Sequence, residues 1–306
     1  MEEVVVHLCL PGCSPSQCEY RVQTSWTVEH LLALIFERNQ ISDSVGFALF
    51  QGTEEKDLLL RSEGLISESL PAPDGEIFIR RRYFPVEKPT HSLLLALESV
   101  QLHRDVLKGL YPLTATHYLR LGALSLLAAI GPGRPPEQLA ESMRSISHYI
   151  PNHLLVQDGG TQAWERPLAE EYRTLSAKAG PTPDPAAYRD ELERMQPVLF
   201  GSSFFDAWEL GIQEGFIACR TKVTVAISRE AISILVPLGK GEHRLERTHL
   251  LREVTGWAAD QTAMMFIFTL DSKHENRCIL ECEDADEMVI LCNTYAQQLV
   301  EKDKLS

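Results

Sequence analysis

Three cysteines near the start of the chain, Cys9, Cys13 and Cys18, are the residues whose type and spacing come nearest to a metal site. Structural zinc sites hold the metal with four cysteine or histidine ligands, which usually come from closely spaced pairs. No histidine or further cysteine supplies that paired spacing here. The sequence therefore predicts no metal ion and no other cofactor. Four further cysteines lie in apolar, strand-like or helical surroundings, and we interpret them as reduced thiols: Cys219, Cys278, Cys282 and Cys292.

The sequence lacks the common catalytic motifs. It has no Walker loop, no GxSxG, no HExxH and no glycine-rich dinucleotide fingerprint. The ten histidines are scattered, so their spacing alone groups no nucleophile with a base and an orienting acid. The GPGRPP segment that starts at Gly131 holds too much proline to begin a phosphate-binding helix and is typical of a loop between helices. We therefore expect a protein that is not an enzyme.

Basic residues form two groups that could bind an anionic lipid headgroup, because a phosphoinositide needs several convergent cations. The groups are Arg80, Arg81 and Arg82 at the end of a predicted strand, and Lys240, Arg244 and Arg247 in a predicted loop that extends to Arg252. Glu242 and Glu246 dilute the second group. Phosphoinositide binding is therefore an alternative function and not the leading one.

The overall composition limits the class of protein. With 306 residues, the chain is long enough for about two domains, or for one large domain of several lobes. Its 44% hydrophobic and 24% charged residues exclude a disordered chain and an integral membrane protein. No run approaches the ~18 apolar residues of a spanning helix, and the N-terminus lacks the pattern of a signal peptide. These features predict a cytoplasmic protein without a transmembrane segment.

The charge balance argues against nucleic acid as a partner. Lys and Arg together number 29 and Asp and Glu number 43, which gives a formal net charge of -14. Proteins bind phosphate backbones mainly through cationic side chains that release counterions. So acidic a chain would repel such a backbone.

Hydrophobic periodicity predicts three successive units, of which residues 1–85 are the first. This unit begins with a hairpin of strands at 4–10 and 19–24, followed by a helix for which Thr27 is a suitable N-cap. Further strands follow, the last of them from Glu76. Hairpin, helix and further strands in this order are typical of a ubiquitin-like roll.

The second and third units differ in their hydrophobic period. Residues 86–197 carry apolar side chains at helical spacing, which predicts an all-helical lobe. In residues 198–306 the period becomes two, which predicts antiparallel strands, and the chain closes with a helix from 284 to 302. Several strands followed by one helix are the plan of a pleckstrin-homology or phosphotyrosine-binding sandwich.

Four phrases of the sequence resemble the FERM family: IFIRRRYF at 77–84, DVLKGLYPL at 105–113, YIPNHL at 149–154 and VLFGSSFFDA at 198–207. The last is the most specific. It resembles the junction between the second and third lobes, especially in FERM domains that follow a myosin-tail-homology domain in unconventional myosin tails and related motorless pleckstrin-homology proteins. The resemblance implies an α+β fold: a three-lobed FERM cloverleaf with a ubiquitin-like lobe, an all-helical lobe, and a pleckstrin-homology or phosphotyrosine-binding-like β-sandwich closed by a helix.

The junction phrase itself suggests a mechanical role. Gly201 would let the backbone turn tightly out of a helix into a strand. Phe200, Phe204 and Phe205 are bulky side chains that would hold both lobes in place around that turn. These residues report on the fold and not on chemistry.

The AMMFIFTL segment at 263–270 is the candidate peptide-binding strand. In sandwiches of this type, the strand before the final hairpin has a free edge beside the C-terminal helix, where an incoming segment can bind. If Phe266 and Phe268 face the core, their neighbours on the strand face outward. The predicted peptide groove consists of Met265, Ile267, Leu291 and Tyr295. The alternative is a strand that is covered on both faces.

Together these observations predict a non-catalytic interaction module that binds cytoplasmic tails or helices of membrane and scaffold proteins. The resemblance points to cargo recognition in a myosin-like tail or a scaffold, in the cytoplasm, at the cytoskeleton or the membrane cortex. The alternative function is a peripheral adaptor between membrane and cytoskeleton that binds phosphoinositides.

Overall fold

A computed structural model of the chain describes residues 3–7, 19–42, 45–52, 57–69, 77–85, 87–156, 160–213, 216–239, 241–260, 262–270 and 277–305. The chain divides into two compact units, Met1–Gln101 and Leu102–Ser306. The sequence predicted three lobes, with boundaries after residues 85 and 197. This three-lobe division stays a prediction.

The first unit combines small antiparallel sheets with helices. Its elements are β1 (Glu3–His7), β2 (Glu19–Gln23), α1 (Val28–Arg38), β3 (Phe47–Gly52), β4 (Asp57–Leu59), α2 (Ile66–Ser69) and β5 (Ile77–Arg81). Strand β1 pairs with β2, and β3 lies between β4 and β5. Hairpin, helix and further strands follow in the predicted order, and the short helix α2 is an element that was not predicted.

The start of α1 shows how the sequence builds this unit. The side chain of Thr27 accepts a hydrogen bond from the backbone N–H of His30, which confirms the predicted N-cap. Leu31 and Ile35 lie one turn apart and are buried in the core of the unit, together with alternating residues of the strands. One apolar stripe of α1 therefore covers the strands.

Helices dominate the chain from residue 92 to residue 195. They are α3 (Ser92–Leu107), α4 (Ala115–Ile130), α5 (Pro136–Met143), a 3₁₀ turn (Ile146–His148), α6 (Asn152–Leu155), α7 (Gln162–Ser176) and α8 (Ala187–Met195). Thr114 caps α4 by accepting from the backbone N–H of His117. Buried side chains of α4 and α7, among them Leu126 and Leu168, share one core.

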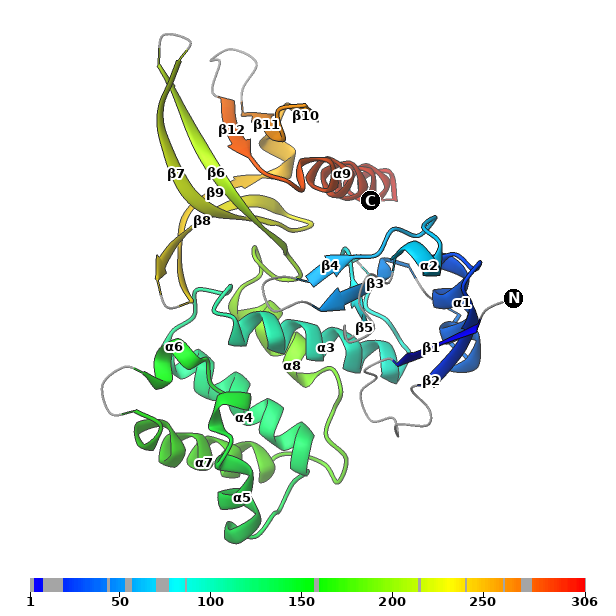
Figure 1. Cartoon of the computed structure of the whole chain (residues 1–306). Coiled ribbons are helices and arrows are strands. Elements are labelled where there is room, and N and C mark those ends of the chain that lie inside the picture. The colour runs from blue at the N-terminus through cyan, green and yellow to red at the C-terminus, as the bar shows by residue number, and fades with distance from the viewer. Residues whose placement is uncertain are drawn as a thin grey trace. The chain divides into compact units, whose positions relative to one another are not determined.

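The C-terminal part of the second unit is a seven-stranded antiparallel sheet with a helix. Its elements are β6 (Ser203–Gln213), β7 (Phe216–Ile227), β8 (Ala231–Gly239), β9 (Glu242–Leu250), a 3₁₀ turn (Leu251–Glu253), β10 (Gly256–Asp260), β11 (Met265–Thr269), β12 (Arg277–Glu281) and α9 (Ala285–Leu305) (Figure 1). The strand order is β10-β11-β12-β6-β7-β8-β9, so β10 and β9 are the edge strands among the described residues. Helix α9 packs against β10 and β11.

One predicted element is wrong in the C-terminal part. The segment predicted as a basic loop from Lys240 to Arg252 contains strand β9, which pairs with β8 from Ala231↔Leu250 to Gly239↔Glu242. Most of its side chains are exposed, because β9 is an edge strand. A strand at an exposed edge can fold without alternating apolar and polar residues. The hydrophobic period of the sequence therefore does not reveal such a strand.

Candidate functional site

The predicted junction between helices and sheet is a tight turn at Gly201, whose φ is +67°. Phe200 precedes this turn and is 1% exposed, and the guanidinium groups of Arg189 and Arg229 lie 4.9 and 6.0 Å from the centre of its ring. The ring of Phe204 packs edge-on against the ring of Tyr111, and the two ring centres are 5.4 Å apart. Phe200 and Phe204 therefore contact residues on both sides of the turn, as predicted, and Phe205 is buried.

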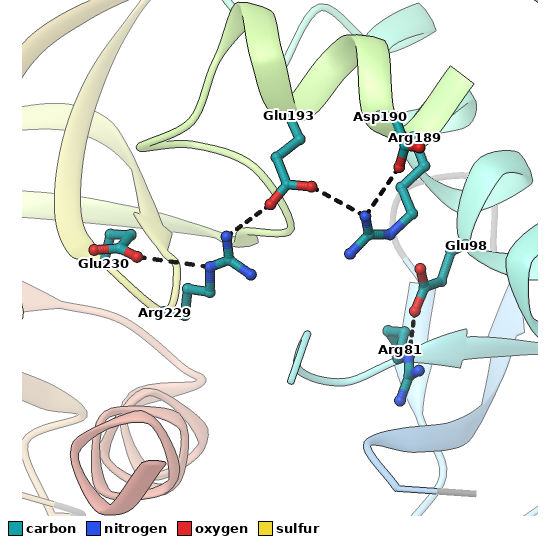
Figure 2. A network of polar contacts seen from close by, with 7 residues as sticks. All are labelled: Arg81, Glu98, Arg189, Asp190, Glu193, Arg229 and Glu230. Carbon is teal, nitrogen blue, oxygen red and sulfur yellow. Dashed lines mark hydrogen bonds and ion pairs between the residues drawn. The ribbon is translucent and has the colours of Figure 1, made fainter. Parts of the chain in front are cut away.

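An ion-pair chain strengthens the same junction. Glu193 of α8 accepts from Nη2 of Arg229, in the β7–β8 turn, at 2.7 Å and from Nη1 of Arg189 at 3.0 Å (Figure 2). Arg189 also pairs with Asp190 at 3.2 Å, and only 4% of its side chain is exposed. One carboxylate thus links a helix of the helical region to a turn of the sheet.

A second contact between helices and sheet depends on glycine. The carbonyl oxygen of Gly241 would lie 1.8 Å from a Cβ atom at Gly109, whose φ is +72°. Nδ1 of His243 lies 2.9 Å from the carbonyl oxygen of Gly109. A carbonyl oxygen can only accept a hydrogen bond, so Nδ1 carries the proton and donates it. Nε2 of His243 lies 3.2 Å from Oγ1 of Thr224. The β8–β9 turn is therefore bound to the segment that follows α3.

Arg81, one of the predicted lipid-binding residues, is not available for that role. Its side chain is buried, and Nε donates to Oε1 of Glu98 at 2.7 Å (Figure 2). Its backbone N–H donates to Oε1 of Gln101 at 2.7 Å. Arg80 and Arg82 are half-buried. The prediction that Arg81 presents its charge to a headgroup is wrong, because the charge is used inside the fold.

The second predicted cationic group is also largely paired. Arg244 binds Glu246 at 2.8 Å, and Nη2 of Arg247 donates to both carboxylate oxygens of Glu209, at 2.5 and 2.6 Å. The bond to Glu209 raises the pKa of Arg247 further. Lys240 lies outside the described residues. These pairs weigh against a lipid site at β9, since the arginines already have carboxylate partners.

The predicted peptide groove is not assembled as expected. Leu291 and Tyr295 of α9 are 1% and 0% exposed, so they belong to the core and cannot line an open groove. Phe266 and Phe268 are also fully buried, and Met265 and Ile267 alternate with them on β11. The two predicted pairs therefore lie on opposite faces of β11. Only the expectation that Met265 and Ile267 face away from the core is consistent with this pattern.

The free strand edge belongs to β10 instead of β11. Strand β11 is paired on both sides, with β10 and with β12, whereas β10 has only β11 as a strand neighbour among the described residues. Trp257 of β10 is paired with Phe268 and shares its face. Its indole Nε1 donates to Oδ1 of Asn293 on α9 at 2.9 Å. A half-buried aromatic ring thus lies between the sheet edge and the helix.

Trp257 is not among the predicted site residues, because the VTGWAA segment at 254–259 has the pattern of one more strand of the sandwich. Its signal is an aromatic residue in a segment otherwise made of small residues, followed by Asp260 and a turn. Trp208 was missed for a different reason, since the strand predicted to follow Gly201 was examined for its phenylalanines at the junction and not for the side chains further along it. It is 39% exposed, which is unusual for a tryptophan.

The buried histidine of the helical region is structural. Nε2 of His103 lies 2.7 Å from the carbonyl oxygen of His148, so this nitrogen carries a proton and cannot accept one from Ser125, whose Oγ lies 3.2 Å away. Nδ1 lies 3.2 Å from the hydroxyl of Tyr188. Burial lowers the pKa of His103, which keeps the ring neutral. His103 therefore does not act as a general base on Ser125.

Metal binding and membrane crossing can each be addressed within the described residues. Within them, no group of three or more His, Cys, Asp or Glu side chains is arranged to hold a metal ion. None of the helices described there combines the length and the apolar character that crossing a bilayer requires. Cys9, Cys13 and Cys18 lie outside the described residues.

Comparisons with known proteins identify the architecture. Residues 85–189 match the family described as FERM central domain. Among solved structures, the chain resembles the human myosin 7b C-terminal MyTH4-FERM domain in complex with the harmonin-a PDZ3 domain (TM-score 0.69, 18% identity) and mutant 1 of the Dictyostelium discoideum myosin VII MyTH4-FERM MF2 domain (TM-score 0.70, 13% identity). For each of these two structures, the match covers 97% of this chain and 60% of the other protein's chain.

A third similar structure is the complex of the FERM and C-terminal domains of Drosophila Merlin (TM-score 0.69, 14% identity), in which 98% of either chain is covered. A sequence search of curated proteins finds no match. The chain spans 60% of the length of the MyTH4-FERM chains that it resembles. At these identities the likeness shows the fold.

Proposed function

We propose that this chain, which has the FERM fold and contains a FERM central domain at residues 85–189, is a protein-interaction module that binds extended or helical segments of partner proteins. The observation that carries the proposal is the edge of β10, which has a strand neighbour on one side only among the described residues and lies beside α9. An open strand edge beside a helix is a common place for peptide capture.

The chemistry of this edge favours an extended ligand. A segment that aligns with β10 can form main-chain hydrogen bonds with its unpaired side, and these bonds supply affinity without regard to sequence. Trp257 adds a large apolar surface at the same place, and its indole N–H is already bound by Asn293. The ring therefore offers its apolar surface to a ligand. Such a rigid aromatic side chain is typical of residues that dominate binding energy.

Charge adds a preference to this edge. Asp260 ends β10, and Asp286 lies in the first turn of α9, which follows directly on β12. Within a chain of net charge -14, both support a ligand with basic or apolar side chains. We propose that such ligands are cytoplasmic tails or helices of membrane and scaffold proteins.

The wider role rests on the comparisons. The human myosin 7b MyTH4-FERM domain was solved with a PDZ domain bound, which is a fact about that protein. We propose cargo recognition in a myosin-like tail or scaffold, at the cytoskeleton or the membrane cortex. We also propose three lobes, residues 1–85, 86–197 and 198–306, for the division of the whole chain.

The proposal is tested by selecting displayed random peptides against the full chain and measuring the best binder by fluorescence anisotropy. Trp257→Ala should weaken this peptide about tenfold or more, because an aromatic contact is lost from the site. The matched control is Leu245→Ala on β9, the opposite edge of the sheet, where the side chain is 39% exposed. Equal effects of the two substitutions would refute capture at β10.

Hydrogen exchange gives a second, independent measurement. Bound peptide should slow exchange of the β10 amides, whereas amides of β9 should exchange as in the free chain. Protection that is confined to β9, or to the helical region, would place the ligand elsewhere and overturn the proposed site.

A further inference from the structure

Helix α9 begins near one end of the β10 edge, which we call the Asp260 end. Strand register pairs Asp260 with Met265 of β11, and Met265 with Glu281 of β12. The chain enters α9 soon after Glu281, and on the way the backbone N–H of Cys282 donates to the carbonyl oxygen of Met264 at 2.7 Å. The start of the helix is therefore fixed close to the turn that follows β10.

From the Asp260 end, α9 advances along β10 toward the opposite, Gly256 end. Asn293, which binds the indole of Trp257, lies about 12 Å beyond the start of α9, at a rise of about 1.5 Å per residue. Trp257 lies about 10 Å from Asp260 along β10, at a rise of about 3.4 Å per residue. The two lengths agree and α9 packs against β10, so helix and strand run beside each other over this stretch.

Ile290 is the apolar residue of α9 that lies along this stretch. It is one turn before Asn293 and one turn after Asp286, so the three share one side of the helix. Ile290 is 45% exposed. Ala259 lies on the same face of β10 as Trp257, carries only a methyl group and is half-buried. A bound strand with an apolar side chain opposite Ala259 would therefore cover two apolar groups of the protein.

The Asp260 end is acidic. Asp260, Asp284 and Asp286 are all exposed there. Two backbone N–H groups of the turn after β10 donate to Asp260, but uncharged donors leave its negative charge in place. Glu283 and Glu287 lie in the same stretch and have interaction partners of their own. Three exposed carboxylates thus gather where β10 ends and α9 begins.

Within the described part of the sheet and α9, cations do not balance these carboxylates. Residues 256–270 and 278–301 contain no Lys or Arg. Arg220 of β7 reaches the same row of the sheet, where its charge is paired with that of Glu281. Lys222 of β7 lies four strands from β10, or about 19 Å at about 4.8 Å per strand, which is more than the screening length of physiological salt.

The Gly256 end of β10 is less acidic. Arg252 precedes the strand, and Arg277 of β12 is paired with Thr269, which is the register partner of Gly256. Both arginines are exposed, and Glu253 is exposed beside them. The negative charge of the β10 edge is therefore concentrated at its other end.

We propose that the β10 edge binds an extended segment whose apolar side chain packs on Ala259 and Ile290, followed toward the Asp260 end by Lys or Arg on the same face. This inference rests on the proposed function and adds to it the order of the ligand's side chains. Charge fixes that order, because a segment bound the other way round would bring its cation toward Arg252 and Arg277.

Peptides selected on the full chain from a displayed random library test this order. Those that lose affinity for Trp257→Ala, and so bind at β10, should share an apolar residue with Lys or Arg two positions away on one side only. Enriched peptides without that basic residue, or with Asp or Glu in its place, would refute the inference and leave the proposed function standing. Peptides that bind Trp257→Ala as tightly as the unchanged chain would refute both.

Charge reversal on α9 separates the acidic end from the net charge. Asp286→Lys should weaken the best basic peptide about fivefold or more, because two cations then face each other. With Gln in place of the peptide's basic residue, the same variant should have little effect. The control is Glu301→Lys, an equal change at an exposed position near the end of α9, where salt screens the charge and affinity should stay within about twofold. Equal losses would mean that only net charge matters and would overturn the inference.

A double-mutant cycle tests the contact with Ile290. Ile290→Ala should weaken the selected peptide about fivefold, and so should Ala in place of the peptide's apolar residue. Because both changes remove one contact, together they should weaken binding clearly less than the product of the two factors. The control is Val300→Ala, whose side chain is 53% exposed further along α9 and which should show no such coupling. Independent effects of Ile290→Ala and the peptide change would contradict the assigned contact.

A second copy of the chain is another occupant that an open strand edge could take. Sedimentation velocity of the free chain should show no dimer that depends on Trp257. A concentration-dependent dimer that is lost in Trp257→Ala would assign the edge to self-association and contradict a basic partner.

Discussion

Nδ1 of His243 lies 2.9 Å from the carbonyl oxygen of Gly109, and this hydrogen bond joins strand β9 to the segment that follows α3. The partners are 134 residues apart in the sequence. Beside this bond, Gly109 lets two backbones approach more closely than a side chain would allow, because a Cβ atom there would lie 1.8 Å from the carbonyl oxygen of Gly241. Helices and sheet of the second unit are therefore held together partly by backbone contact.

Gly109→Ala should destabilise the second unit by about 2 kcal/mol or more. The new Cβ would meet the carbonyl oxygen of Gly241 at 1.8 Å, and the residue would have to keep a φ of +72°. Gly133→Ala is the control, because Gly133 also has a positive φ, +67°, but nothing lies within 4 Å of its Cβ position. Urea unfolding should show a clearly larger loss for Gly109→Ala. Equal losses would mean that the backbone contact contributes nothing.

Stability should fall as the pH drops below the ordinary histidine pKa of 6.5, because of His103. Burial lowers the pKa of this ring in the folded state, so below pH 6.5 the unfolded chain binds a proton that the native protein does not. The unfolding free energy then decreases by up to about 1.4 kcal/mol per pH unit for this one proton. His103→Gln should show a shallower decrease between pH 7 and pH 5 in urea unfolding. An unchanged slope would contradict the argument.

Local signals in the sequence predicted much of the fold. Thr27 acts as an N-cap as expected, and Thr114 caps α4 in the same way, because a hydroxyl beside the first turn can accept a hydrogen bond from a free backbone N–H however the helix packs. The alternation in β11 and β12 identified both strands for a similar reason, since each buries one face. Strand β9 was missed because neither of its faces needs a run of apolar side chains.

The candidate site depended on pairing, which local signals do not contain. The MFIF pattern predicted correctly that Phe266 and Phe268 are buried, but not that β10 would lie outside β11 and take the edge position. Likewise, Arg81 reads as one of three adjacent cations in the sequence. Only the fold shows that Glu98, 17 residues away, neutralises it inside the first unit.

Glu193→Ala should cost the second unit about 3 kcal/mol. The substitution removes the carboxylate that binds both Arg189 and Arg229, and the side chain of Arg189 is nearly buried. The matched control is Glu170→Ala, which removes the partner of the exposed Arg166 on α7. That surface pair should contribute nothing measurable. The thermal unfolding midpoints of both variants at neutral pH test this prediction. Similar midpoints for Glu193→Ala and Glu170→Ala would contradict a structural role for the ion pairs at the junction.

Alkylation should separate the described cysteines into two classes. Burial raises the pKa of Cys278 and Cys292 to about 12 and that of Cys282 to about 11, so these thiols hold almost no thiolate at pH 8. Cys219 is exposed on β7. Iodoacetamide at pH 8, followed by peptide mass mapping, should therefore modify Cys219 long before the other three. In urea above the unfolding transition all four should react at similar rates, because unfolding removes the burial that raised the three pKa values. Early modification of Cys278 or Cys292 in the native protein would show that the interior of the sandwich opens to solvent far more readily than its packing suggests.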